Sequence, residues 1–311
     1  MTPLIVLPAA VPRALFPFEP HVLLRRGLRY HYLDEGQGDP VVMVHGNPTW
    51  SFYYRELVRT LSPRHRVIVP DHIGMGLSDK PGIERYNYRL ADRIDDLEAL
   101  LASLGLETGA KLTLVMHDWG GMIGMGYAAR HPERVGRLVL MNTAAFHLPS
   151  DMQLPWVLQA IRDTPLGSLA VRGLNAFSRV ASHVGTKRSH LSKVLRDAYC
   201  APYDSWQNRV ATYRFVEDIP VKSRHPSYAT VTQVEAGLSQ FSGTPTLFAW
   251  GMKDFVFTPR VLEHWQQRWP QAEVHRFDDC GHYVLEDASA EVCALVDGFL
   301  QRHALATGKE Q

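Results

Sequence analysis

Cysteine, long apolar runs and an excess of one charge are all scarce in this sequence of 311 residues. The three cysteines (Cys200, Cys280 and Cys293) lie far apart and are odd in number, so a disulfide framework is not expected. Unpaired thiols of this kind are typical of proteins in a reducing compartment. We therefore predict reduced cysteines and a cytoplasmic location.

The balance of charge excludes another class of partner. Lys and Arg total 33 and Asp and Glu total 32, which gives a formal net charge of +1. This balance gives no electrostatic reason to expect a nucleic acid or another polyanion as the partner. Metal motifs are missing too, because the 15 histidines include no H-E-x-x-H pair and no clustered Cys and His spacing. We predict no metal and no other cofactor.

No uninterrupted apolar stretch reaches the roughly 18 residues that a membrane-spanning helix needs. The N-terminal arm from Leu4 to Phe18 is apolar, but prolines interrupt it and no basic residue precedes it. It therefore does not resemble a signal peptide. The sequence leaves open whether this arm contacts a partner, a membrane surface or the protein's own sheet.

Short apolar, β-branched runs alternate with helical segments from about residue 21 to residue 147. This alternation predicts an α/β fold with a mostly parallel sheet, and the near-continuous apolar runs predict strands buried on both faces. Apolar residues spaced at i, i+3 and i+4 predict helices at 54–61 and 90–104. The predicted strands are a hairpin of 22–25 and 28–33, followed by 41–45, 66–69, 111–116 and 137–141.

Strand-like runs stop between residues 148 and 237. Polar helical segments interrupted by prolines fill this stretch, which predicts an inserted helical cap. The alternation then resumes with strands at 245–250 and 272–277 and helices near 261–269 and 290–302. The predicted organisation is a core of residues 1–147 and 238–311 with a cap of residues 148–237.

The sharpest local motif is His-Asp-Trp-Gly-Gly at 117–121, between a predicted strand and a predicted helix. A nucleophile elbow is a strained turn of this kind that needs small residues and holds a reactive side chain above the sheet. The reactive side chain here is the carboxylate of Asp118, and a helix N-terminus stabilises such an anion. Taken alone, Asp118 is more simply explained as a helix cap. The stretch 124–129 (GMGYAA) mimics a dinucleotide fingerprint but lies inside the helix, so we reject a nucleotide site.

Polar motifs at the ends of other predicted strands favour the catalytic interpretation. Open α/β sheets gather their ligands at the carboxyl ends of the strands. His282 is then placed to act as general base beside Asp118, with Asp254 holding the imidazole in one tautomer. Nucleophile, acid and histidine follow one another in the chain order of α/β-hydrolases. We therefore predict a catalytic triad of Asp118, Asp254 and His282, although His282 and Asp254 alone are each typical of structural residues.

These motifs resemble the haloalkane dehalogenase group of α/β-hydrolases, over nearly the whole chain outside the cap. The resemblance implies an α/β-hydrolase fold, and it implies that the side-chain N–H groups of Asn47 and Trp119 hold the departing anion. Some dehalogenases carry a Glu as the triad acid where this chain has Asn142, which leaves Asp254 as the acid. The matching segments are 45–49 (HGNPT), 71–81 (DHIGMGLSDKP), 117–121 (HDWGG) and 251–254 (GMKD).

A narrower resemblance links the chain to the β-lactone decarboxylases of long-chain olefin biosynthesis. That family converts cis-3-alkyl-4-alkyl-oxetan-2-ones to cis-alkenes and carbon dioxide, beside a thiolase, a β-lactone synthetase and a reductase. The resemblance implies a hydrophobic lactone substrate and a multi-enzyme assembly. Under this hypothesis Asp118 attacks the ring carbon, no water is needed, and His282 mainly orients groups and tunes charge. The segments that carry it are 47–55 (NPTWSFYYR), 142–149 (NTAAFHLP), 250–257 (WGMKDFVF) and 279–287 (DCGHYVLED).

Several alternatives stay open. A haloalkane dehalogenase is the second hypothesis, a non-enzymatic binding module is a further one, and Met116 disfavours a simple esterase. Epoxide hydrolases share the motifs but protonate the epoxide with two cap tyrosines, for which the sequence offers Tyr199, Tyr203, Tyr213 and Tyr228. Apolar cap residues are expected either to line a pocket for alkyl chains or to form ordinary cap core. They are Leu154, Trp156, Leu158, Ile161, Leu166, Leu169, Phe177 and Trp206.

Overall fold

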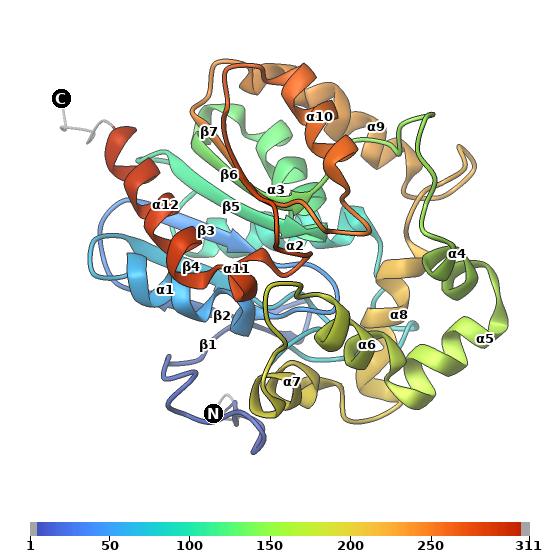
Figure 1. The fold of residues 1–311 in the computed structure, drawn as a ribbon. Helices are drawn as coiled ribbons and strands as arrows, with labels where there is room; N and C mark the ends of the chain where they lie inside the picture. Colours follow the sequence, from blue (N-terminus) through green and yellow to red (C-terminus); the bar gives the residue numbers. More distant parts are fainter. Residues whose placement is uncertain (1–4, 306–311) are drawn as a thin grey trace.

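An eight-stranded sheet runs through the centre of the computed structural model, which describes residues 5–305 (Figure 1). The strand order is β1-β2-β4-β3-β5-β6-β7-β8, with β2 antiparallel to both β1 and β4 and every other pair parallel. The strands are β1 (His21–Arg25), β2 (Leu28–Glu35), β3 (Pro40–Val44), β4 (Arg66–Pro70), β5 (Leu112–Asp118), β6 (Val135–Thr143), β7 (Thr246–Gly251) and β8 (Glu273–Phe277).

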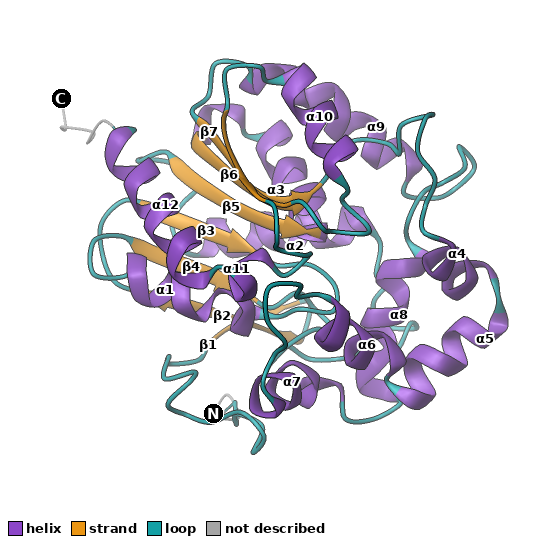
Figure 2. Ribbon diagram, viewed as in Figure 1, coloured by secondary structure: helices purple, strands orange, loops and turns teal. Residues whose placement is uncertain are grey.

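The central strands are apolar on both sides because helices cover both faces of the sheet (Figure 2). In β3, Val42 and Val44 belong to one buried cluster while Val41 and Met43 belong to the other. Successive side chains of a strand point to opposite faces, so a doubly covered strand needs an unbroken apolar run. The structure confirms the mostly parallel sheet that the apolar runs predict.

Helices form one layer on each side of the sheet. On one side lie α2 (Leu90–Ser103), α3 (Trp119–Arg130), α9 (Tyr228–Gly237) and α10 (Pro259–Arg268). On the other side lie α1 (Arg55–Leu61), α11 (Val284–Asp287) and α12 (Ser289–Arg302). Short 3-10 helices connect the elements at Ser51–Tyr54, Pro132–Arg134, Ala201–Tyr203, Gln207–Arg209 and Leu238–Phe241.

The stretch between β6 and β7 contains helices and no strand, and Figure 1 shows α4 to α8 together beyond the carboxyl ends of the parallel strands. This inserted helical region confirms the predicted fold class. The last helix of the stretch, α9, lies against α3 in the core layer. The inserted helices are α4 (Trp156–Asp163), α5 (Pro165–Ser168), a π-helical turn (Leu169–Gly173), α6 (Ala176–Val184), α7 (Lys193–Cys200) and α8 (Val210–Glu217).

The N-terminal arm packs on the protein's own core. Val11, Phe16 and Phe18 are buried, and the Phe16 ring lies 5.2 Å from the Trp50 ring and 6.0 Å from the Phe52 ring, measured between centroids. This part of the arm therefore buries apolar surface within the chain. Leu4, where the predicted arm begins, lies outside the described residues.

A buried carboxylate organises the loop that follows β4. Asp71 accepts hydrogen bonds from His31 Nδ1 at 2.8 Å, from the Ser51 backbone N–H at 2.6 Å and from the Leu77 backbone N–H at 2.8 Å. Burial alone would raise the pKa of Asp71, but these hydrogen bonds and the neighbouring histidines outweigh it and lower the pKa to about 2. The ionised side chain thus joins β2, the loop after β3 and the loop after β4.

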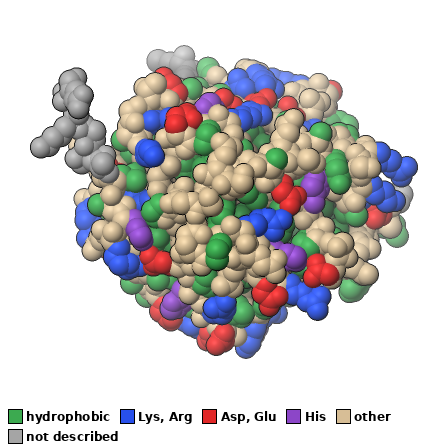
Figure 3. Space-filling model, turned by 90° about the horizontal axis from the view of Figure 1, so that it is seen from above, with side chains coloured by type: hydrophobic (Ala, Val, Ile, Leu, Met, Phe, Trp, Pro, Cys, Tyr) green, Lys and Arg blue, Asp and Glu red, His purple; other side chains and the backbone are tan. Residues whose placement is uncertain are grey.

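The surface carries both signs of charge. Acidic and basic side chains are interspersed on the face shown in Figure 3, in keeping with the small net charge. Among the helices of residues 5–305, none is both long enough and apolar enough to cross a bilayer.

Candidate active site

Asp118 stands at a strained turn between β5 and α3. Its backbone φ is +53°, a left-handed value that residues other than glycine rarely adopt. Such strain persists only where the surroundings enforce it, and it is typical of nucleophile elbows. The neighbours must be small: a Cβ at Gly120 would lie 1.8 Å from the Val44 carbonyl oxygen, and a Cβ at Gly46 would lie 2.0 Å from the Asp118 carboxylate.

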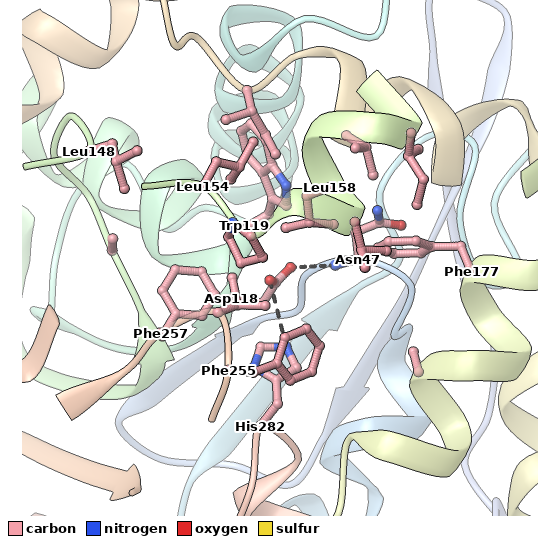
Figure 4. Close-up of a pocket in the computed structure, with 18 of the residues that line it drawn as sticks. Asn47, Asp118, Trp119, Leu148, Leu154, Leu158, Phe177, Phe255, Phe257 and His282 are labelled. Atoms are coloured by element: carbon pink, nitrogen blue, oxygen red, sulfur yellow. Dashed lines mark hydrogen bonds and ion pairs between the residues drawn. The ribbon is translucent and has the colours of Figure 1, made fainter. Parts of the chain in front are cut away.

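The two carboxylate oxygens of Asp118 have different surroundings. Oδ1 accepts a hydrogen bond from the Asn47 backbone N–H at 2.6 Å, and Oδ2 lies 3.7 Å from His282 Nε2 (Figure 4). Burial raises the pKa of Asp118, while His282 and the backbone N–H groups of Asn47 and Trp119 oppose this rise. Oδ1 is therefore held by the backbone, and Oδ2 faces the imidazole of His282.

His282 is held by the acid that the chain order predicts. Its Nδ1 lies 2.7 Å from Asp254 Oδ2, and both side chains are buried. Burial alone would lower the pKa of His282, but the carboxylates of Asp254 and Asp118 outweigh it and raise the pKa. The structure thus brings Asp118, His282 and Asp254 together in the order nucleophile, imidazole, acid, while their catalytic roles stay predictions.

Asn142 takes a part that the sequence does not reveal. Its Nδ2 donates to Asp254 Oδ2 and to the Gly251 carbonyl, each at 3.0 Å, and its Oδ1 accepts from the Gly251 N–H at 2.8 Å. Asn142 is no acid, but it positions the acid from the neighbouring strand β6. The available signal was a lone Asn directly after the apolar run 137–141.

His117 is a second contact that sequence reasoning missed. It is fully buried next to the nucleophile, and its Nε2 lies 2.9 Å from the His282 carbonyl oxygen. Burial lowers the pKa of His117 well below the ordinary value, so this imidazole is neutral and donates from Nε2. The backbone of His282 is thereby tied to the strand that carries Asp118.

Asn47 and Trp119 both face the cavity above Asp118 (Figure 4). The Asn47 amide Nδ2 donates one hydrogen bond, of 3.0 Å, to the Thr212 carbonyl in α8, so its other N–H remains for a ligand. Its Oδ1 is buried and has no partner within the described chain. The Trp119 ring packs 5.4 Å from the Phe215 ring. Their predicted role as anion cradle is compatible with these positions and stays a prediction.

A cavity of about 440 Å³ lies above Asp118, between the sheet and the cap. Its floor presents the polar groups of Asn47, Asp118, Trp119 and His282, and most of its other lining side chains are apolar. Such a lining is typical of sites for apolar ligands that a few polar groups orient. Of the two alternatives for the apolar cap residues, pocket lining holds for Leu154, Leu158, Ile161 and Phe177.

Neither alternative holds for the four other apolar cap residues. Trp156, Leu166, Leu169 and Trp206 are exposed and do not line the cavity. Trp156, Leu166 and Leu169 lie in helices, and an i, i+3 and i+4 pattern alone does not fix which side of a helix faces the core, while Trp206 lies in a turn. They belong neither to the pocket nor to the cap core.

No tyrosine of the described chain lines the cavity, although four were available in the cap. The Tyr199 hydroxyl donates to Glu286, and the Tyr203 hydroxyl lies 3.4 Å from the Thr49 carbonyl oxygen. The two-tyrosine arrangement that an epoxide hydrolase needs is therefore not formed around Asp118. Within residues 5–305, no three His, Cys, Asp or Glu side chains are placed to hold a metal ion.

Comparisons with known proteins agree with this geometry. Residues 39–289 match the family described as the alpha/beta hydrolase fold. The chain is 56% identical to the cis-3-alkyl-4-alkyloxetan-2-one decarboxylase of Shewanella oneidensis, covering 94% of this chain and 92% of that protein. It is 45% identical to the protein of the same name from Xanthomonas campestris, covering 93% and 98%.

The chain is also similar in structure to a solved haloalkane dehalogenase. The haloalkane dehalogenase DatA of Agrobacterium tumefaciens is 26% identical in sequence and matches with a TM-score of 0.81 over 92% of this chain and 97% of that one. The predicted resemblance to dehalogenase-like proteins is confirmed. This chain belongs to the α/β-hydrolase family and, within its dehalogenase-like members, to the group of the cis-3-alkyl-4-alkyloxetan-2-one decarboxylases.

Proposed function

We propose that this protein is a β-lactone decarboxylase that converts cis-3-alkyl-4-alkyloxetan-2-ones to cis-alkenes and carbon dioxide. The observation that carries the proposal is the 56% identity over 94% of the chain to a decarboxylase of that name. An aspartate with one free oxygen at the floor of an apolar cavity supports it, because the chemistry requires a carboxylate that attacks carbon.

In the first step Asp118 Oδ2 attacks C4 of the lactone, the ring carbon that bears the ring oxygen. A C–O bond forms to Asp118, and the C4–O bond of the ring breaks with inversion at C4. The ring oxygen leaves with its electron pair as part of a carboxylate. In this proposal the free N–H of the Asn47 amide and the Trp119 indole N–H stabilise the new anion, which is supported by the position of both residues in the cavity lining.

In the second step the bond between C3 and the released carboxylate breaks. Its electron pair forms the C3–C4 double bond, carbon dioxide departs, and the C4–O bond to Asp118 breaks to restore the aspartate. Inversion followed by anti elimination converts a cis-lactone to a cis-alkene. No proton and no water is consumed, so His282 serves as a fixed neighbour that lowers the pKa of Asp118 and so favours its ionised form.

The test incubates the purified protein with a synthetic cis-β-lactone that carries two long alkyl chains. Gas chromatography then measures the alkene, with Asp118→Ala as the control. We expect cis-alkene from the intact protein alone. The proposal would be contradicted if Asp118→Ala formed alkene at the same rate, or if the intact protein formed no alkene.

A haloalkane dehalogenase is the second candidate, favoured by Asn47 and Trp119 beside the nucleophile and by the structural match to DatA. In that reaction Asp118 displaces a halide, and His282 then activates a water that cleaves the alkyl ester. Halide release from a bromoalkane, with no alkene from the lactone, would favour this second candidate.

The assembly and the location are part of the same proposal. The resemblance to olefin biosynthesis enzymes supports a complex with a β-lactone synthetase and a reductase, and co-purification of tagged proteins would test it. Three free cysteines support a cytoplasmic location, which fractionation of cells would test.

A further inference from the structure

The cavity reaches the surface of the cap through an apolar rim. Two of the rim residues are strongly exposed, at 54% for Val180 in α6 and 48% for Phe255 in the loop after β7. Exposed apolar side chains gathered at the mouth of a cavity are typical of binding surfaces rather than of ordinary solvent-facing surface. The apolar residues that both line the cavity and are exposed are Leu148, Val157, Val180, Val221 and Phe255.

An exposed tryptophan lies next to one of these rim residues in the chain. Trp156 is the first residue of α4 and directly precedes the rim residue Val157, and it is 78% exposed. It does not line the cavity, so substrate contact does not explain it. Tryptophan is enriched where proteins meet the interface between lipid and water, because its ring is apolar and its N–H is polar.

Two exposed cationic residues also lie next to rim residues in the chain. Arg179 and Lys222 are exposed and are chain neighbours of the rim residues Val180 and Val221. Residues 148–237 contain eleven Lys and Arg but seven Asp and Glu, a formal charge of +4 within a chain of +1. The rest of the chain is therefore net negative, and the positive charge is concentrated in the stretch that forms the cap. Anionic lipid headgroups attract such surfaces.

We propose that the rim, together with its chain neighbours Trp156, Arg179 and Lys222, docks on an anionic lipid bilayer. A lactone with two long alkyl chains partitions into lipid, and docking lets it enter the cavity without crossing water. The proposed function supplies the nature of this substrate. The docking itself does not depend on turnover and is measured separately.

The experiment is sedimentation of the full chain with vesicles. One set contains equal parts of phosphatidylglycerol and phosphatidylcholine, and the other contains phosphatidylcholine alone. We expect the protein to sediment with the anionic vesicles and to be released when the salt rises from about 0.05 M to about 0.5 M. Trp156→Ser and the double variant Arg179→Glu/Lys222→Glu should each lower the bound fraction at least about fivefold.

Leu24→Ser is the matched control, because Leu24 is 62% exposed on β1, the edge strand of the sheet, and does not line the cavity. It should bind as the unchanged protein does. Equal sedimentation with both vesicle sets, no sedimentation with either, or an equal loss in Leu24→Ser would overturn the proposal. A dimer in solution that Trp156→Ser abolishes, without vesicle binding, would assign the rim to contact between copies instead.

An activity comparison separates docking from catalysis. Neither Trp156 nor the two cations line the cavity, so turnover of a short, water-soluble β-lactone should stay unchanged in both variants. Turnover of a long-chain lactone embedded in anionic vesicles should fall about fivefold, in parallel with binding. Equal turnover of the embedded lactone by variant and unchanged protein would contradict the docking role. If no lactone is turned over at all, the proposed function fails while sedimentation still tests docking.

Discussion

Asn142 and Asp254 meet at the carboxylate oxygen that also holds the imidazole of His282. Asp254 Oδ2 lies 3.0 Å from Asn142 Nδ2 and 2.7 Å from His282 Nδ1, while the other oxygen, Oδ1, accepts from the Val256 N–H at 2.7 Å. Asn142 adopts a left-handed φ of +37° at the end of β6, a region in which asparagine is enriched. Two strands, β6 and β7, therefore fix the acid of the triad.

Removal of the Asn142 side chain should impair catalysis more than folding. Asn142→Gly keeps the left-handed backbone accessible but leaves Asp254 Oδ2 with one donor fewer. A hydrogen bond to a charged group contributes about 1.5–3 kcal/mol, so we expect kcat to fall by about tenfold to a hundredfold with KM little changed. Steady-state kinetics on the lactone measure this, and thermal unfolding checks the fold. A change confined to the melting temperature would show that Asn142 is structural only.

Substitution of His282 should distinguish the two chemistries. Decarboxylation needs no water, so His282→Gln should lower lactone turnover by less than about a hundredfold. Asp118→Asn should lower it by more than about a thousandfold, because the nucleophile is lost. If His282 activates water, the same His282→Gln variant would stop at an alkyl ester on Asp118. Mass spectrometry of the intact protein after a bromoalkane challenge would reveal that ester.

The pH profile should show a single acid limb set by Asp118. Its pKa is raised above the ordinary 3.8 by burial, and only the ionised form attacks. Activity should therefore be full above this raised pKa and should fall as the pH drops through it. The pKa of His282 is also raised, from an ordinary value of 6.5. If His282 had to be neutral to act as a base, activity would fall as the pH drops through that raised pKa, which lies above 6.5. Measurement of kcat/KM against pH decides between these, and a limb above 6.5 would contradict the water-free route.

Asp71 should make stability depend on pH at the acid end. Its pKa is lowered from 3.8 to about 2 in the folded protein, so its contribution is full above its unfolded pKa and is lost as the pH falls towards 2. A shift of this size corresponds to about 2 kcal/mol. Asp71→Asn should therefore lower the free energy of unfolding by about that amount at neutral pH, and by less in acid. Urea unfolding measures this, with the exposed Asp163→Asn as control.

The sheet and the catalytic constellation could be predicted because each leaves a local signal. Apolar runs such as 111–116 mark strands covered on both faces, and the elbow motif at 117–121 places Asp118 at the end of one of them. Asn142 and His117 could not be assigned, because their partners lie more than a hundred positions away in the chain.

The cap was less predictable for a related reason. Leu158 lines the cavity, whereas Trp156, two positions earlier on the same helix, faces solvent. An apolar pattern marks helical segments but does not say which side of a short cap helix meets the core. Likewise, the hydrogen bond from Asn47 to the Thr212 carbonyl joins the core to the cap. Neither of the two sequence segments contains a pattern that predicts this contact.

The most direct test of the proposed chemistry is lactone turnover in water enriched in oxygen-18, followed by mass spectrometry of the peptide that contains Asp118. After many turnovers to cis-alkene, we predict an unlabelled Asp118, because elimination restores the original carboxylate oxygens. Incorporation of oxygen-18 into Asp118, together with a hydrolysed product, would contradict the account. It would show that water attacks an ester or anhydride at Asp118, as in the hydrolytic members of the family.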